Sequence, residues 1–155
     1  MIRHLTNDEL AVLAASTLAE TAFLLAEPSP HTGRWQHDWA CAVVPFEAAV
    51  HGRLVVAAPV ALAAQVAAEM PLVATADEAL LQAGHAVAGL AGVMASAVAS
   101  AIFETAGSFR LGAPSVVTCE PPLAPGERAN RVTLVNEAGQ PVRVELVLGN
   151  GAFSA

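Results

Sequence analysis

Positively charged residues are scarce in this sequence. Its 155 residues include 7 Lys and Arg against 14 Asp and Glu, which gives a formal net charge of −7. Binding to a nucleic-acid backbone depends on clustered cations that neutralise phosphates. The composition therefore argues against nucleic acid as a partner.

Cysteine is also scarce, with only Cys41 and Cys119 in the chain. The two residues are far apart and stand in no CxxC or Cys/His spacing, so we interpret both as reduced, buried small hydrophobic residues of a cytoplasmic protein. A chain of this length buries enough surface to fold without disulfides or metals. We therefore expect one domain over residues 1–155.

The motifs of several enzyme classes are missing. The five histidines form no HxxxH or HExxH spacing, and the chain contains neither a GxSxG nucleophile motif nor a GxxxxGK[ST] phosphate loop. We expect neither a metal nor a cofactor. The first residues, MIRHLTNDEL, carry charges where the apolar region of a signal peptide would lie, so no such peptide is expected.

Apolar residues, in contrast, make up 55% of the chain, and many of them are alanine. The segment Ala79–Phe103 has no charged residue and is long enough to span a membrane. It nevertheless contains Gln82, His85, Ser96 and Ser100, has few bulky apolar residues and lacks flanking Lys/Arg clusters. We predict a buried helix of a soluble domain rather than membrane insertion.

The N-terminal region predicts a helix followed by a loop. Thr6-Asn-Asp-Glu9 matches a capping box, in which the Thr hydroxyl and the Glu carboxylate bind the free N–H groups of the first turn. The helix must end before Pro28. The stretch EPSPHTGRWQHDW is rich in Pro, Gly and polar residues and predicts a loop, in which Trp35, His37 and Trp39 alternate as the edge of a strand.

Short apolar runs between Ala40 and Ala57 predict a hairpin, with Gly52 supplying the turn conformation. Pro59 suits the first position of a helix from Val60 to about Met70, where its missing N–H would be unpaired anyway. These patterns place two strands and a second helix after the first helix.

A second capping box, Thr75-Ala-Asp-Glu78, predicts a long third helix that runs to about Thr105 and stops at Gly107. The segment FRLGAPSVVTCE follows, then a loop with three prolines, and finally two alternating strands around Glu137–Gln140. The expected fold is therefore α+β, with a mostly antiparallel sheet covered by helices.

The third helix holds the one polar pattern that could carry chemistry. Within QAGHAVAG, Gln82, His85 and Gly89 stand at positions i, i+3 and i+7 and share one face. A glycine inside a helix costs about 1 kcal/mol relative to alanine, and this helix also contains Gly84 and Gly92. Close approach of another helix or of the sheet would offset that cost, and we expect Gly89 to pack in this way.

Over residues 5 to 148 the chain resembles the CheC, CheX and FliY family of chemotaxis phosphatases, and within it the CheX-like branch. The resemblance rests on blocks in the same order as in the family. They are LAETAFLLAEP for the first helix, FEAAVHGRLVVAAPVALAAQVAAEM for a strand pair and helix, DEALLQAGHAVAG for the motif helix, and FRLGAPSVV for the strand after it.

The resemblance implies a site on the third helix. In the family, an ExxN motif on this helix docks on a phosphorylated CheY response regulator: the Asn orients the water that hydrolyses the aspartyl phosphate, and the Glu contacts a cation of the regulator. Here Gln82 occupies the Glu position and His85 the Asn position, and a glycine follows four residues later, as in the family. The first helix has Glu20-Thr-Ala-Phe23 where a second ExxN could be sought.

Three hypotheses remain open at this stage. The first is a two-component signalling domain that binds a phosphorylated CheY-like receiver, with weak or lost phosphatase activity. The second is an active CheY phosphatase that uses Gln82 and His85 as a variant catalytic pair. The third is a structural or sensory module in which QAGHAVAG only packs, and burial of His85 against the sheet would favour it. The family also implies a homodimer whose sheets join across the two subunits.

Overall fold

The structure of the protein, a computed structural model, describes residues 5–22, 24–29, 39–48, 51–69, 76–103, 109–117, 123 and 125–149. For residues 68–69 and 76–81 it describes only the backbone. The elements in chain order are α1 (Asn7–Ala22), β1 (Ala26–Ser29), β2 (Trp39–Glu47), β3 (His51–Pro59), α2 (Val60–Glu69), α3 (Ala76–Ile102), β4 (Arg110–Leu111), β5 (Ser115–Val117), β6 (Arg128–Asn136) and β7 (Pro141–Leu148).

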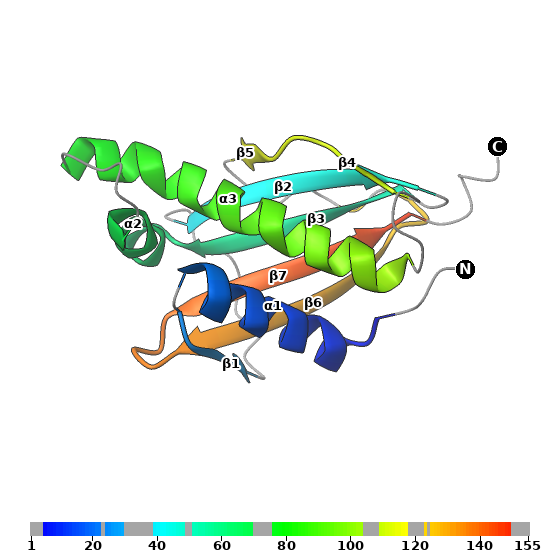
Figure 1. The fold of residues 1–155 in the computed structure, drawn as a ribbon, viewed down its shortest axis with the longest axis horizontal. Coiled ribbons are helices and arrows are strands. Elements are labelled where there is room, and N and C mark those ends of the chain that lie inside the picture. Colours follow the sequence, from blue (N-terminus) through cyan, green and yellow to red (C-terminus); the bar gives the residue numbers. More distant parts are fainter. Residues whose placement is uncertain are drawn as a thin grey trace.

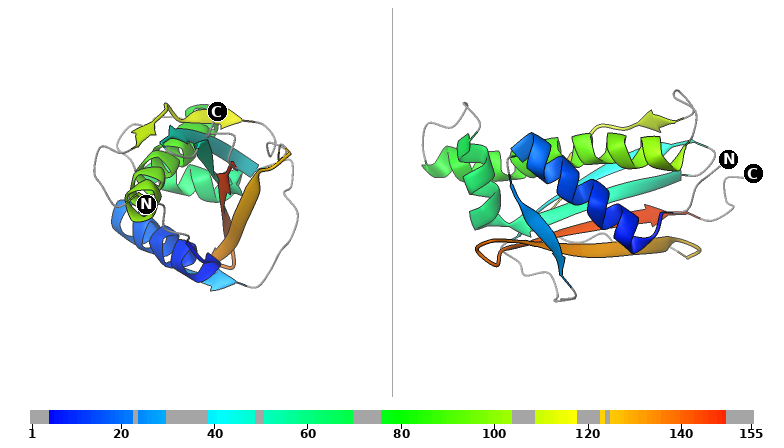
Figure 2. Two further views of the ribbon diagram at one scale, coloured as in Figure 1. Left: turned by 90° about the vertical axis from the view of Figure 1, so that its right-hand side faces the viewer. Right: turned by 60° about the horizontal axis from the view of Figure 1, so that its bottom comes forward.

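Within these described ranges, seven strands form a single sheet in the order β1-β6-β7-β3-β2-β4, and β5 also pairs with β2. Every strand pair is antiparallel. Helices α1, α2 and α3 all lie on one face of this sheet, and α3 crosses it diagonally (Figures 1 and 2). The expected α+β fold, an antiparallel sheet covered by helices with one long helix, is confirmed.

The main hydrophobic core lies between the sheet and the three helices. Its largest fully buried side chains include Leu10 and Leu18 from α1, Met94 from α3, and Leu54 and Phe46 from the sheet. Burying one such side chain stabilises the fold by about 1.5–3 kcal/mol. Because α3 contacts both other helices and β2, β3 and β5, it is the element around which the helical layer is built.

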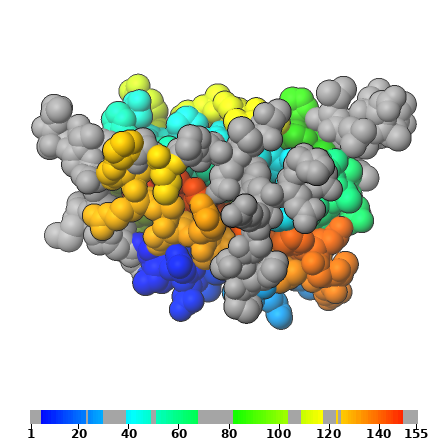
Figure 3. Space-filling view, turned by 180° about the vertical axis from the view of Figure 1, so that it is seen from behind, coloured from blue at the N-terminus to red at the C-terminus, as the bar shows by residue number. Residues whose placement is uncertain are grey.

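The opposite face of the sheet combines a small apolar cluster with ion pairs. Cys41, which is fully buried as predicted, packs there with Val55 and Ala57. On the neighbouring strands, Arg131 Nη2 lies 2.6 Å from the carboxylate of Glu145, which is only 2% exposed. Figure 3 shows this side of the molecule, where β6 and the turn after it form much of the described surface.

The start of α1 follows the predicted capping box. The Glu9 N–H donates to Thr6 Oγ1 at 3.1 Å, and the Thr6 N–H donates to Glu9 Oε1 at 3.3 Å. The helix ends at Ala22, before Pro28 as expected, but the loop prediction was wrong at its start, because Glu27–Ser29 belong to the edge strand β1. Pro28 is tolerated in β1 since an edge strand leaves one side of its backbone unpaired.

The β2–β3 hairpin is confirmed, but the role assigned to Gly52 was wrong. Gly52 lies inside β3, directly opposite Phe46. A Cβ at this position would stand 2.5 Å from Cζ of Phe46 and 2.7 Å from the carbonyl oxygen of Val147. Glycine is therefore required by the aromatic ring that lies over the strand, and not by a turn.

The remaining predicted elements agree closely with the structure. Helix α2 begins directly after Pro59, and the C-terminal hairpin forms around Glu137–Gln140. The segment FRLGAPSVV forms two short strands, β4 and β5, instead of one. Several predicted features lie outside the described residues: the hydroxyl cap at Thr75, the helix stop at Gly107, Cys119, and the strand edge at Trp35 and His37.

The long apolar segment is part of the helical layer. Residues Gln82–Ile102 of α3 are long and apolar enough to cross a membrane, with a mean hydropathy of 1.7, and half of that segment is buried inside the fold. Met94, Val98 and Ile102 are completely buried in the main core. This burial is what we predicted for the core helix of a globular domain.

Candidate functional site

The candidate site lies on α3, whose two faces differ sharply. The buried face is a continuous row of small and medium apolar residues: Ala83, Ala86, Val87, Leu90, Ala91, Met94, Ala95, Val98 and Ala99. The outward face presents His85, Gly89, Val93, Ser96 and Ser100, which are all exposed and recur every three or four residues. We call these five residues the outward face of α3. It carries no Asp, Glu, Lys or Arg.

Gln82 and His85 lie one turn apart near the start of this face. Gln82 is half-buried and His85 is exposed. Because residues three apart on a helix are neighbours, the structure brings the two predicted site residues together on one surface. His85 is not buried against the sheet, as it would be if its role were only to pack.

The glycines of α3 do not share one role. A Cβ at Gly84 would lie 3.0 Å from Cγ1 of Val116 in β5, and a Cβ at Gly92 would lie 3.5 Å from Cγ of Pro114. A Cβ at Gly89 would meet no atom of the described part of the chain within 4 Å. Our expectation that Gly89 packs closely was therefore wrong, whereas Gly84 allows the chain before and within β5 to lie against the helix.

The groups of this site suit positioning rather than bond making. Gln82 offers a carboxamide with a donor and an acceptor side by side, and neutral His85 offers one donor and one acceptor on opposite sides of the imidazole ring. Together they can orient a water or a polar group of a partner. Among the described residues there is no cluster of three or more His, Cys, Asp and Glu side chains that could hold a metal ion.

The C-terminal half of α1 lies beside the first half of α3. Leu18 of α1 and Ala86, Val87 and Leu90 of α3 line the same small internal void. On its exposed side α1 carries Glu20, whose Oε1 accepts a hydrogen bond from Ser16 Oγ at 3.4 Å. A carboxylate is thus available on the helix next to the motif helix, although Phe23, the last residue of the second motif position, lies outside the described residues.

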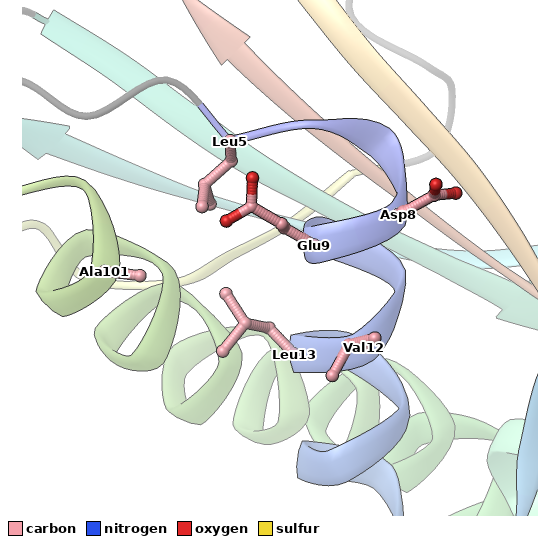
Figure 4. A pocket seen from close by; sticks show the side chains of 6 residues that line it. All are labelled: Leu5, Asp8, Glu9, Val12, Leu13 and Ala101. Atoms are coloured by element: carbon pink, nitrogen blue, oxygen red, sulfur yellow. The ribbon is translucent and has the colours of Figure 1, made fainter.

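A separate apolar groove lies at the other end of α3 (Figure 4). It has a volume of about 330 Å³ between α1 and α3 and is lined by Leu5, Asp8, Glu9, Val12, Leu13 and Ala101. Val12, 66% exposed, stands at its rim. The carboxylate of Glu9 is engaged with Thr6 in the helix cap, and Ala101 is 16 residues, or about 24 Å of helix, beyond His85. The groove was not predicted from the sequence. The local feature that could have indicated it is Val12, an apolar residue on the otherwise polar side of α1.

Comparisons with known proteins find similarity in structure only: no family model matches the sequence, and no curated protein matches it. A chain of the CheX–CheY–BeF3–Mg+2 complex from Borrelia burgdorferi superposes with a TM-score of 0.72 at 14% identity, covering 95% of this chain and 100% of that one. The chemotaxis protein CheX from Vibrio vulnificus gives 0.68 at 12% identity, covering 91% and 94%.

CheX from Desulfovibrio desulfuricans gives a TM-score of 0.67 at 13% identity, with 90% of this chain and 95% of that one covered. These likenesses extend over nearly the whole described fold, from α1 to the C-terminal hairpin. At such low identity they establish a shared architecture and not shared site residues. The chain therefore has the fold of the CheX-type chemotaxis proteins.

Proposed function

We propose that this protein is a CheX-like signalling domain that binds a phosphorylated CheY-like receiver through the part of the outward face of α3 around His85 and Gly89, with weak or lost phosphatase activity. The observation that carries the proposal is the exposure of His85 on that face, next to Gln82, at the two positions that the sequence resemblance assigns to the ExxN motif. The solved complex of CheX with CheY, which has the same fold, supports a receiver as the partner.

The two substitutions weaken the chemistry in different ways. Gln82 keeps its hydrogen-bonding groups but lacks the negative charge of Glu, so an ion pair with a receiver lysine becomes a weaker hydrogen bond between the lysine ammonium and a neutral carboxamide oxygen. The imidazole of His85 cannot present a donor and an acceptor side by side, so a water held by it loses one of its two orienting contacts. Since phosphoryl transfer depends mainly on positioning, the hydrolysis rate falls.

The proposal is tested with the CheY-like receiver domains of the source organism. Each receiver is phosphorylated with a small phosphodonor, and the loss of the aspartyl phosphate is followed with and without the protein, while binding is measured with the beryllofluoride-loaded receiver. We expect saturable binding and a dephosphorylation rate close to the spontaneous one. The double variant Gln82→Glu/His85→Asn, which restores the family motif, should raise that rate at least tenfold.

Two other outcomes would decide for the alternatives. A wild-type rate far above spontaneous hydrolysis that His85→Ala abolishes would identify an active phosphatase with a variant motif. If neither the wild type nor the restored variant binds any receiver, the result would support the third hypothesis, a structural or sensory module with the CheX-type fold. A genomic neighbourhood without chemotaxis or two-component genes would point to the same third alternative.

The proposal includes a cytoplasmic location and a homodimer. Receivers of the CheY type are cytoplasmic, so a domain that binds one must meet it there. The described sheet ends in the short strands β4 and β5 on one side, and Val116 of β5 is 50% exposed, so an apolar edge is available to a second subunit. Size-exclusion chromatography with light scattering checks this, and a strict monomer at micromolar concentration would contradict the dimer.

A further inference from the structure

Gly89 is the glycine of α3 beside which the described part of the chain places no neighbouring atom. Glycine lowers helix stability relative to alanine because it has more freedom to lose on folding. Gly84 is accounted for by Val116, which a Cβ would meet at 3.0 Å, whereas a Cβ at Gly92 would touch Pro114 at an ordinary contact distance of 3.5 Å. Among the described residues, no atom lies within 4 Å of the place where a Cβ of residue 89 would stand, so alanine would fit there and stabilise the helix.

The open space next to Gly89 lies about one helical turn from His85. Side chains on a helix lean toward its N-terminus, so a residue covers the surface over the preceding turn rather than over its own Cα. A side chain at position 89 would therefore cover part of the surface beside His85, four residues earlier on the same outward face. Glycine leaves that surface open.

We propose that Gly89 is a specificity-determining residue of the docking surface: it leaves a notch beside His85 that receives the phosphorylated active-site loop of the receiver. This inference rests on the proposed function and deepens it. Because the five residues of the outward face include no Asp, Glu, Lys or Arg, fit at this notch, and not charge pairing with these five residues, limits which partner surface can approach the imidazole.

The test compares substitutions at Gly89 with matched substitutions elsewhere on α3. Gly89→Ala and Gly89→Leu add one methyl group and one large side chain beside His85. Gly92→Ala makes the same small change where the added Cβ only touches Pro114 at an ordinary contact distance. Ser100→Leu places the same large side chain on the same exposed face, 11 residues or about 16 Å farther along the helix.

Binding is measured by titration with a beryllofluoride-loaded CheY-like receiver, and stability by the thermal unfolding midpoint of each variant. We expect Gly89→Ala to weaken binding several-fold and Gly89→Leu at least tenfold, while Gly92→Ala and Ser100→Leu keep the wild-type affinity. Both alanine variants should unfold about 2–4 °C higher than the wild type. Higher stability together with weaker binding is a combination that damage to the fold cannot produce.

The possible results separate this inference from the proposed function. If the wild type binds the receiver and the Gly89 variants bind equally well, the inferred role of Gly89 is wrong, whereas the proposed receiver-binding function is still supported. If neither the wild type nor Gly92→Ala binds a receiver, the proposed function is wrong. The inferred role of Gly89, which depends on that function, is then wrong as well. If Ser100→Leu weakens binding as much as Gly89→Leu does, bulk anywhere on the face matters and the specific role of Gly89 is overturned.

Discussion

The flank of α3 that meets β5 and the outward face of the same helix use the same residue type for opposite purposes. On the flank, Gly84 allows Val116 to pack so close to the helix that a Cβ at position 84 would lie only 3.0 Å from Cγ1 of Val116. On the outward face, Gly89 has empty space beside it. A glycine inside a helix thus indicates close approach, but the sequence alone does not say whether the neighbour belongs to the same chain or to a partner.

The buried and outward faces of α3 can be compared through two adjacent residues, Met94 and Val93. Met94 is fully buried, so Met94→Ala should lower the free energy of unfolding by about 2–5 kcal/mol through lost burial and a residual cavity. Val93 is 48% exposed, and Val93→Ala should change it by no more than about 0.5 kcal/mol. Urea denaturation followed by circular dichroism measures both, and similar losses would show that the two faces are not distinct.

The packed flank is tested by enlarging Gly84. Gly84→Val should destabilise the protein by about 1–3 kcal/mol, because its side chain would overlap Val116, which a Cβ alone already meets at 3.0 Å. Adding Val116→Ala should recover part of the loss by removing the crowding methyl groups. A double variant no more stable than the single one would mean that the strain does not arise at this contact.

At Gly89 and Gly92, an added side-chain atom should raise the free energy of unfolding instead of lowering it. Gly89→Ala and Gly92→Ala should each raise the free energy of unfolding by about 1 kcal/mol, the difference in helix propensity, since the added Cβ meets no close atom at either site. Chemical denaturation of the isolated protein gives the values. A loss of stability in Gly89→Ala would reveal an internal neighbour and remove the contrast with Gly84.

The smallest effect on stability is expected at His85. Because its side chain is exposed, His85→Ala should leave the free energy of unfolding within about 0.5 kcal/mol of the wild type. The same variant should weaken receiver binding, measured by titration with the beryllofluoride-loaded receiver. A large destabilisation would assign His85 to packing, in agreement with the structural alternative.

Local patterns were enough to predict the elements whose stability is itself local. The cap at Thr6 and Glu9, the hairpin strands and the common face of Gln82 and His85 follow from hydrogen bonds and helical spacing within a few residues. The strand β1 could not be predicted in this way, because it forms by pairing with β6, more than 100 residues away in the sequence.

The misassigned role of Gly52, the packing role of Gly84 and the burial of Glu145 were missed for a common reason. Gly52 lies under Phe46, Gly84 lies against Val116, and Glu145 is buried beside Arg131 of the neighbouring strand. In each case the neighbour that decides the role belongs to another element. The spacing of residues within one segment predicts the face of the helix or strand on which a residue lies. Only the tertiary structure shows which residue of another element packs against that face.

The lack of charge on the outward face of α3 has a kinetic consequence. Charged docking surfaces steer their partners and reach association rate constants of about 10⁸–10⁹ M⁻¹s⁻¹ at low salt, whereas neutral ones stay near 10⁵–10⁶ M⁻¹s⁻¹. A partner that docks on a face of His85, Gly89, Val93, Ser96 and Ser100 receives no such local guidance. These five residues therefore add no electrostatic steering of their own, and a dependence of the association rate on ionic strength would come from charges elsewhere on the chain, whose net charge is −7.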